Sequence, residues 1–542
     1  MLVNLMGFSL DPKGAGTLKS YVSAHQSSVS ADALVDHVLS LGAGYAVIEE
    51  PYVDKDYSAD YLNFYAAAFR NYPRHTKRIH LFAKSVEPAL RLPMAEQQTA
   101  LEEAGYLGFV VVRPIAQGPI GRTILKFPSL GPDLLVRSTV RATFNVHLLG
   151  SRLELTGAAP FIQQDERLGS CAQASIWMAA RQVHERHGRT PWHSIADITA
   201  LATTPTDADL SQHLPAGSGG LNLIHIIRAL RAMGHQPLFD FFLTESESGS
   251  EDAVEVRREA GRSIVRYLDS GLPVIVALAD VGEKVGHAIT AVGYVEARGA
   301  ACRASHGYDA FVRAIVVHDD QRGPYRLMPL THDDVGSLPK DRLLIYSDKP
   351  LTVEDAASHI FVPLPSRVFL RADRADTVVR DFLESYVEQV GGAMLLRIDG
   401  VVPDAALAVK DFYALVTSGR LIRRTYLTTA GRYRHHLARA DLAEEIKTEL
   451  LVRRLPHFVW VTELISPDCP PPEGDDARNI IGHMVVNATS STDSDFDLLM
   501  AHMPHVLVHR DINVEIGADP PFKETALIFE MHAPYRGRKR LD

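Results

Sequence analysis

The sequence predicts a multi-domain protein of the α+β class, and three observations support this prediction. The chain has 542 residues, 46% of them apolar, which is too long for one compact core and apolar enough for two or three. Helical and strand patterns alternate in its first part, whereas helical patterns precede a series of strands in its middle part. We therefore expect an N-terminal α/β domain (residues 1–150), a central α+β domain (151–346) and a C-terminal α+β region (347–542).

The N-terminal domain is predicted from alternating helical and strand segments. Val110, Val111 and Val112 form an apolar run typical of a strand that is buried on both faces. The Pro- and Gly-rich segment Pro114–Arg122 that follows predicts a loop. We expect helices near Ala31–Leu41 and Ala59–Asn71, and strands at Tyr45–Glu49, Arg78–Ala83 and Gly108–Arg113. No catalytic motif is visible in this domain.

The central domain begins with a short strand and continues with helices before its main sheet. One helix is predicted to stop before Gly271, because a glycine followed by Pro273 is a common helix end. We expect a strand at Thr143–Leu149, helices from Cys171, at Leu221–Met233 and at Val254–Ser270, and a strand at Pro273–Ala279. Polar or Gly-rich segments of this domain predict loops at Gly217–Gly220 and Thr244–Asp252.

In the C-terminal region, a helix is expected at Asp376–Val390 and a Pro-rich loop at Ser466–Asp476.

Charge and cysteine content exclude several classes of protein. The net charge is −10 with basic residues scattered along the chain, so a nucleic-acid partner is not expected. No apolar run is long enough for a signal peptide or a membrane span, which predicts a cytoplasmic protein without membrane contacts. The three cysteines, Cys171, Cys302 and Cys469, are far apart, which excludes a disulfide framework and a thiolate zinc site.

The stretch FIQQDERLGSCAQASIWMAA places Cys171 at the start of a helix. A Gly-Ser pair ends a polar loop, and an Ala-rich run with helical apolar spacing begins at the cysteine. The unpaired N–H groups and the positive dipole of a first helical turn favour the thiolate, which is the nucleophilic form. Gln164 or Gln163, seven or eight positions upstream, could help a backbone N–H to hold a developing oxyanion.

Two strand segments supply a base and an acid. In GHAITAVGY, His287 opens an apolar strand directly after a Gly-containing loop, so its imidazole is expected at the edge of a sheet. In AIVVHDDQRGPY, a β-branched strand runs into Asp319 and Asp320, and a carboxylate at that point can orient an imidazole. Strand alternation predicts that the two carboxylates face opposite sides, and we favour Asp319.

These motifs resemble the papain-like cysteine peptidase superfamily, and most closely its bacterial double-glycine-peptidase-like branch. The resemblance covers roughly Pro160–Leu330 and rests on QQDERLGSCAQAS, GHAITAVGY and VVHDDQRGPY. It implies a papain-like central domain with a helical lobe, an antiparallel sheet and a cleft between them. It further implies that Cys171 is the nucleophile, His287 the general base and acid, Asp319 the orienting acid, and Gln164 or Gln163 the oxyanion donor.

The expected reaction is hydrolysis of a peptide or isopeptide amide through an acyl-thioenzyme, without cofactor or metal. Acyl transfer to an amine is an alternative, because the same residues serve both reactions. A third hypothesis is a catalytically silent module that binds peptides. The expected partner is a peptide or protein substrate, and the flanking domains are expected to set specificity or to recruit protein partners.

Several other residues are interpreted as structural. Cys302 and Cys469 lack a helix start and a matching histidine strand. His184 and His187 have helical spacing but no identifiable third metal ligand. Gly482–Asn487 repeats a Gly-His strand pattern without a cysteine helix. The runs His318–Asp320 and His332–Asp334 resemble the His-Asp pair of metal phosphohydrolases, but the first follows a strand and the second lies in a loop.

Overall fold

The computed structural model divides the chain into two compact units. Unit 1 comprises Met1–Ile264, Gly271–Arg298 and Val312–Ser366, and unit 2 comprises Val265–Ser270, Gly299–Phe311 and Arg367–Asp542. The structure describes residues 3–24, 28–165, 171–187, 191–203, 221–242, 251–279, 286–297, 303, 305–389, 403–440, 444–467, 480–490, 497–510 and 527–531. The predicted loops at Gly217–Gly220, Thr244–Asp252 and Ser466–Asp476 lie largely or wholly outside these residues, as do Cys302 and Cys469.

The N-terminal region contains alternating helices and strands, and the first sheet that its strands form is antiparallel. All six strand pairs along its order β1-β2-β3-β4-β5-β8-β7 are antiparallel. The helices in this region connect strands that are neighbours in the sheet and run in opposite directions, so no crossover connection is needed. The strands are β1 (Asn4–Ser9), β2 (Tyr45–Tyr52), β3 (Thr76–Phe82), β4 (Tyr106–Val112), β5 (Ile120–Lys126), β7 (Ala142–Leu148) and β8 (Ser151–Phe161).

Local signals explain the helices of this region. In α2 (Val29–Ser40), close to the predicted helix, the Ser28 hydroxyl accepts the N–H of Ala31 at 3.3 Å. The predicted helix Ala59–Asn71 is wrong in its bounds, because Asp54 caps α3 (Lys55–Asn63) by accepting the N–H of Tyr57 at 2.9 Å. A 3₁₀ turn, η1 (Tyr65–Ala67), follows it, and the other helices are α1 (Pro12–Val22) and α4 (Met94–Glu103). β4 is buried along its whole length, as predicted.

The second sheet of unit 1 has the order β13-β12-β11-β10-β16-β9, with β6 paired to β11. The predicted helices and strand of this region are present with small shifts of their ends. Its strands are β6 (Leu134–Arg137), β9 (Gln236–Phe241), β10 (Val274–Leu278), β11 (His287–Ala297), β12 (Val312–Asp319), β13 (Gly323–Pro329) and β16 (Ala357–Leu364). Its helices are α5 (Cys171–His187), α6 (Ile195–Ala202), α7 (Leu223–Ala232), α8 (Glu251–Asp269) and α9 (Val353–Ala356), and β14 (Ile345–Tyr346) pairs with β15 (Lys349–Pro350).

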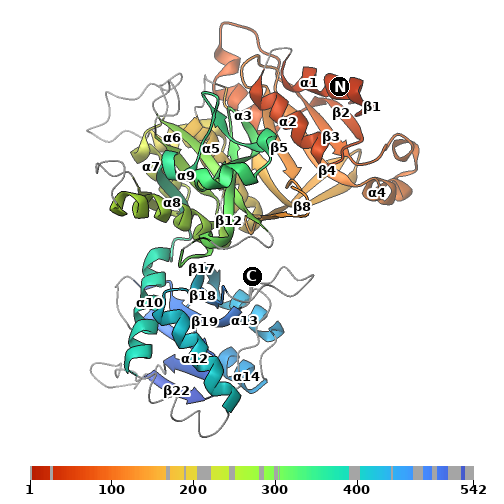
Figure 1. The fold of residues 1–542 in the computed structure, drawn as a ribbon. Helices are drawn as coiled ribbons and strands as arrows, with labels where there is room; N and C mark the ends of the chain where they lie inside the picture. Colours follow the sequence, from red (N-terminus) through yellow and green to blue (C-terminus); the bar gives the residue numbers. More distant parts are fainter. Residues whose placement is uncertain are drawn as a thin grey trace, which may run out of the picture. The chain divides into compact units, whose positions relative to one another are not determined.

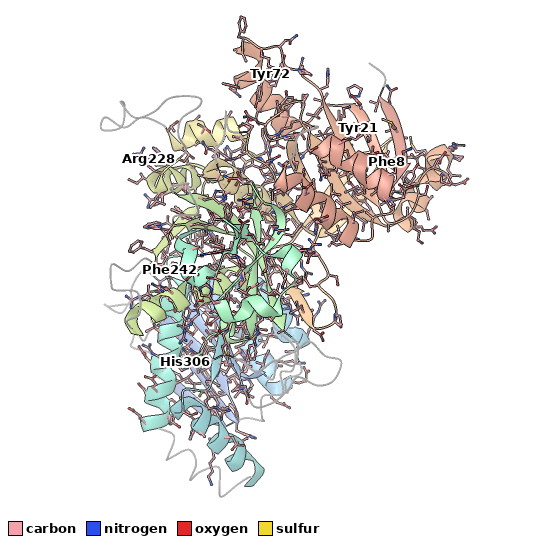
Figure 2. All side chains as sticks on the ribbon, turned by 45° about the horizontal axis from the view of Figure 1, so that its top comes forward. Phe8, Tyr21, Tyr72, Arg228, Phe242 and His306 are labelled. Carbon is pink, nitrogen blue, oxygen red and sulfur yellow. The ribbon has the colours of Figure 1, made fainter. Side chains whose placement is uncertain are left out.

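One core joins the two sheets of unit 1. Helix α5 packs against β10 and β11 of the second sheet and against β7 and β8 of the first (Figure 1). The same core extends from α1 and α2 to β13 and β16, and Phe8 and Tyr21 pack at its N-terminal end (Figure 2). The predicted limit at residue 150 falls in the β7–β8 hairpin, inside this unit.

Unit 2 contains a six-stranded antiparallel sheet of order β17-β18-β19-β20-β21-β22. The predicted helix Asp376–Val390 is present as α10 (Ala372–Gln389). The other elements are α12 (Pro403–Thr417), β17 (Ile422–Thr429), α13 (Ala430–Arg439), α14 (Glu444–Val452), β18 (Phe458–Ile465), β19 (Ile480–Asn487), β20 (Leu498–Met503), β21 (Val506–Arg510) and β22 (Leu527–Met531). In the described part of the chain, no helix combines the length and apolarity needed to cross a bilayer.

A buried arginine organises the core of unit 2. Arg424, on β17, has no exposed surface and donates two hydrogen bonds to Asp269, at 2.9 and 3.0 Å. It donates a third, at 3.1 Å, to Glu463 on β18. Three charge-assisted bonds to one guanidinium offset the cost of burying its charge.

Replacement of Arg424 by Met removes the cation shared by two buried carboxylates, so we expect unit 2 to lose about 3–5 kcal/mol of unfolding free energy. Hydrogen exchange of β17 and β18 peptides measures this loss. Arg380→Met is the matched control, because the Arg380–Asp381 pair is 49% and 51% exposed and is worth at most about 1 kcal/mol. Equal protection in the two variants would contradict this role of Arg424.

Candidate active site

Helix α5 carries Cys171 at its first residue, as the sequence predicts. The apolar positions that predicted this helix are buried, including Ala172, Ile176 and Ala179. Cys171 itself is half-buried and its thiol is free. The helix start therefore brings the Cys171 thiol to the border of the core, where it is partly exposed.

Two buried hydrogen bonds fix α5 against β11. The Ser175 hydroxyl donates to the carbonyl of Ala288 at 3.0 Å, and the Thr290 hydroxyl donates to the carbonyl of Ser175 at 3.3 Å. Ser175 lies one helical turn after Cys171, and Ala288 directly follows His287. These contacts therefore fix the position of the thiol relative to the imidazole.

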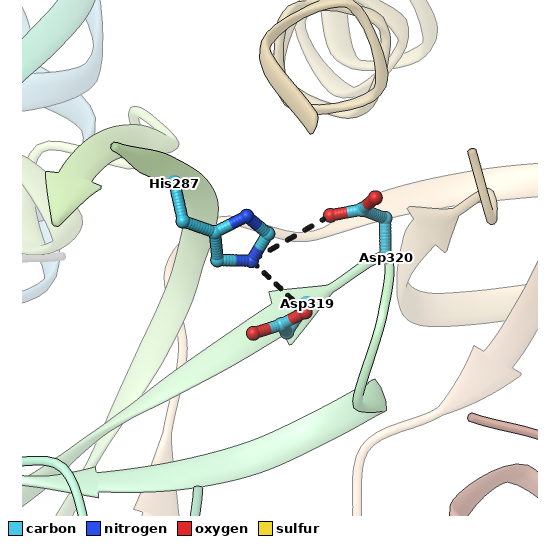
Figure 3. Close-up of side chains that lie close together, drawn as sticks. All are labelled: His287, Asp319 and Asp320. Carbon is cyan, nitrogen blue, oxygen red and sulfur yellow. Dashed lines mark ion pairs between the residues drawn. The ribbon is translucent and has the colours of Figure 1, made fainter. Parts of the chain in front are cut away.

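His287 is the first residue of β11, as predicted, and lies between the thiol and a carboxylate. The preceding Gly286 has a φ of 75°, a conformation that side chains with a Cβ rarely adopt, and it turns the chain into the strand. His287 Nε2 lies 3.2 Å from Oδ1 of Asp319 (Figure 3). Cys171 is among the groups that raise the pKa of His287, so its side chain lies near the same imidazole.

Asp319, at the end of β12, is held by three further donors. Its Oδ1 accepts the backbone N–H groups of Gln321 and Arg322 at 2.8 and 3.1 Å, and its Oδ2 accepts the Tyr346 hydroxyl at 2.7 Å. The Tyr346 ring also lies 5.8 Å from the imidazole of His287, between centroids. Arg322 covers the other side of that ring at 4.2 Å. Tyr346 thus contacts both members of the His287–Asp319 pair.

Asp320 does not face away from the site, so the prediction from strand alternation is wrong. Its Oδ1 lies 3.8 Å from Nε2 of His287, and both contacts meet at this one ring nitrogen (Figure 3). The strand ends at Asp319, and the pairing of β12 with β13 shifts register between Val317 and Asp319. Alternation therefore no longer applies at this position. The site contains two carboxylates near one imidazole.

The buried charges shift each other's protonation. Burial is the largest influence on the pKa of His287 and lowers it, but the charge and hydrogen bond of Asp319, helped by Cys171 and Asp320, raise it well above its ordinary value. Burial raises the pKa of Asp319, but the charge of His287 and the bonds from His287, Tyr346 and Gln321 bring it below its ordinary value. The pair therefore favours a protonated imidazole beside an ionised carboxylate.

The two candidate glutamines differ in their surroundings. The amide oxygen of Gln163 accepts the N–H of Ile120 at 3.3 Å, which directs that side chain to β5. Gln164 is half-buried, and within the described ranges its side chain makes no hydrogen bond. The Gly-Ser pair at 169–170 lies outside the described residues. Of the two glutamines, Gln163 is therefore the one whose side chain is held by a hydrogen bond to the first sheet.

The same three residues have the composition of a cation site. Among the residues that the structure describes, ligand atoms of His287, Asp319 and Asp320 lie within 4.8 Å of one another. One imidazole nitrogen and two carboxylate oxygens suit zinc or another first-row metal. However, the oxygens of Asp319 already accept three hydrogen bonds. These bonds hold the carboxylate in one orientation, in which it faces the imidazole of His287.

The other histidine and aspartate motifs do not form metal pairs in the described part of the chain. His318 hydrogen-bonds to the carbonyl of Pro160 at 3.0 Å, and burial lowers its pKa to about 3. His332 forms an exposed ion pair with Asp355 at 2.7 Å. His483 hydrogen-bonds to the Tyr433 hydroxyl at 2.8 Å. His184 belongs to α5, and the side chain of His187 is outside the described set.

Comparison of the chain with protein-family models and with curated protein sequences gives no match. The residues of the site therefore carry the functional assignment. Sequence patterns had selected Cys171, His287 and Asp319, whereas Tyr346 and Ser175 had no local signal, because their role depends on contacts made only in the folded chain.

Asp319→Asn is expected to lower the pKa of His287 more than Asp320→Asn does, because Asp319 is the nearer carboxylate, at 3.2 Å against 3.8 Å. An NMR titration of ¹³C-labelled histidine rings, with the His287 signal assigned from a His287→Gln variant, measures both values. An equal fall in the two variants would mean that the carboxylates share the role.

The His287–Asp319 pair also makes stability depend on pH. The folded pKa of His287 is raised, so its contribution is full below about pH 6.5 and is lost as pH rises through the folded value. The folded pKa of Asp319 is lowered, so its contribution is present above about pH 3.9 and is lost as pH falls. Urea unfolding should therefore show that Asp319→Asn loses the most unfolding free energy between about pH 4 and 6.5. A loss of unfolding free energy that does not change with pH would contradict the ion pair.

Proposed function

We propose that unit 1 is a papain-like cysteine hydrolase that cleaves a peptide or isopeptide amide. The proposal is carried by one arrangement, in which Cys171 begins α5 near the imidazole of His287 and Nε2 of His287 lies 3.2 Å from Asp319. In this arrangement the protonated imidazole stabilises the thiolate of Cys171, and the carboxylate stabilises the imidazolium. The motifs around the three residues, which resemble the papain-like superfamily, support the same assignment.

The reaction follows from these positions. The sulfur of Cys171 attacks the carbonyl carbon of the substrate as a thiolate, while His287 already carries the proton that the leaving amine needs. In this proposal the developing oxyanion is stabilised by N–H groups in the first turn of α5 and by the amide of Gln164. His287 then donates its proton to the leaving amine as the C–N bond breaks, which leaves a thioester on Cys171. Water, activated by His287, hydrolyses this thioester.

An amine could replace water in the last step, and the product would then be a transferred acyl group. Both reactions share the acyl-thioenzyme, so they differ only in the second nucleophile. A silent peptide-binding module would keep the fold without thiol reactivity. Labelling of the thiol separates this third hypothesis from the two enzymatic ones.

Iodoacetamide is expected to alkylate Cys171 fast at pH 6, where an ordinary thiol, which ionises near pH 8.5, reacts slowly. The reason is the imidazole of His287, which holds the proton of the thiol. Cys302 and Cys469 serve as internal controls in the same chain, and mass spectrometry locates the adducts. His287→Ala should slow labelling of Cys171 at pH 6 by about 10-fold or more. Labelling of Cys171 at the rate of the two controls would favour the silent module.

A metal centre on His287, Asp319 and Asp320 is the second candidate, because these ligand atoms lie within 4.8 Å of one another. The thiol mechanism needs no ion, so alkylation of Cys171 at pH 6 should be unchanged after treatment with EDTA. Asp320→Asn provides a control, since it removes one metal ligand and leaves the His287–Asp319 contact. Loss of both activity and bound metal on EDTA treatment would favour the metal centre.

A further inference from the structure

The α3–η1 segment contacts both flanks of the stretch that precedes the thiol. On the upstream side, the Tyr65 hydroxyl donates to Oδ2 of Asp165 at 2.5 Å, and both side chains are buried. On the downstream side, Nε1 of Trp177, in α5, donates to Oδ1 of Asp56 at 2.9 Å. Asp165 lies directly after Gln164 in the chain. One short segment of the N-terminal sheet region therefore contacts both the residue after Gln164 and the helix that begins at Cys171.

The backbone around Gln164 is held as well. The buried guanidinium of Arg113 donates to the carbonyls of Gly118 and Gln163, the latter at 2.6 Å. The N–H of Gln163 donates to the carbonyl of Ile120 at 3.0 Å. Gly118 has a φ of 67°, and a Cβ there would lie 2.0 Å from the carbonyl oxygen of Gln164. Only glycine allows the two backbones to approach this closely.

The Tyr65–Asp165 contact persists over the accessible pH range. Burial, together with the charge of Asp165 and the hydrogen bond to it, raises the pKa of Tyr65. The phenol therefore stays protonated and remains a donor to the carboxylate. A charge-assisted bond in a buried setting restricts the position of both partners.

We propose that Tyr65 and Asp165 are positioning residues that hold Gln164 in place to stabilise the oxyanion. This inference rests on the function proposed above and extends it to the N-terminal region, in which the sequence shows no catalytic motif. Tyr65 touches no reacting atom and acts through Asp165 and the backbone of its neighbour. A displacement of about 1 Å in a group that stabilises the transition state costs roughly 100-fold in rate.

Two reactions of Cys171 separate this role from a structural one. Acylation by p-nitrophenyl acetate passes through a tetrahedral oxyanion, whereas alkylation by iodoacetamide is a direct displacement that forms no oxyanion. In the full-length protein, Tyr65→Phe should lower the acylation rate by about 10-fold or more, and the alkylation rate should stay within about twofold. Gln164→Ala should show the same pattern, because it removes the donor itself.

Tyr57→Phe is the matched control. Tyr57 lies in the same aromatic cluster, 5.9 Å from Tyr65 between ring centroids, and Tyr65 in turn packs on Tyr72. The Tyr57 hydroxyl donates to the carbonyl of Pro73 at 2.9 Å and not to the loop. Each of the two variants therefore loses one buried hydroxyl, but only Tyr65→Phe removes a hydrogen bond to Asp165. Both rates should be unchanged in Tyr57→Phe.

The positioning role would be overturned if Tyr65→Phe lowered the acylation and alkylation rates equally. It would also be overturned if the ratio of these two rates were the same in Tyr65→Phe and Tyr57→Phe. Absence of fast acylation and fast alkylation in the wild type would instead remove the proposed function. Hydrogen exchange at the Gln163 N–H tests the contact without catalysis, and Tyr65→Phe should speed this exchange relative to Tyr57→Phe. Unchanged exchange would show that Tyr65 does not hold the loop.

Discussion

The burial of α5 between two antiparallel sheets is the constraint on which the arrangement of unit 1 depends. From Ala172 to Ala180 every residue of this helix is buried, and it packs against β7 and β8 on one side and β10 and β11 on the other. A helix enclosed in this way cannot rotate or slide without opening cavities on one face and overlapping atoms on the other. The bonds between Ser175, Ala288 and Thr290 fix its position along β11 as well. The relation of Cys171 to His287 is thus a property of core packing.

The second feature of the site is the density of buried polar groups around one imidazole. Burial of Asp319 opposes its charge, yet two backbone N–H groups, a tyrosine hydroxyl and the imidazole compensate for the lost water. Such a network is stable only when its members are satisfied together, and it then holds each group in one orientation. Elsewhere in unit 1 the same rule gives the opposite charge state. Burial and Arg342 lower the pKa of His37 to about 3, and its neutral ring accepts a hydrogen bond from that arginine at 3.1 Å.

Local sequence patterns predicted the parts of the site that depend on local structure. Each of three residues was located by one local pattern. Cys171 follows a polar loop and starts an Ala-rich helix, His287 follows a glycine and starts a strand, and Asp319 is an acid at a strand end. The rest could not be predicted, because Tyr346 and Tyr65 reach the site only through long-range packing. The placement of Asp320 failed for a related reason, since alternation holds within a strand and the strand ends one residue earlier. The strand direction in the first sheet was not predicted, because alternating helices and strands do not specify it.

The single core of unit 1 also determines how this protein has to fold. The Tyr325 hydroxyl donates to the carbonyl of Leu125 at 2.6 Å across 200 positions, and Arg342 reaches His37 across 305. Such contacts require the closure of very long loops, which slows folding. During synthesis the N-terminal strands leave the ribosome long before β13 and α9 exist. We therefore expect the nascent chain to expose unfinished apolar surface for most of its translation, which makes it a substrate for chaperones.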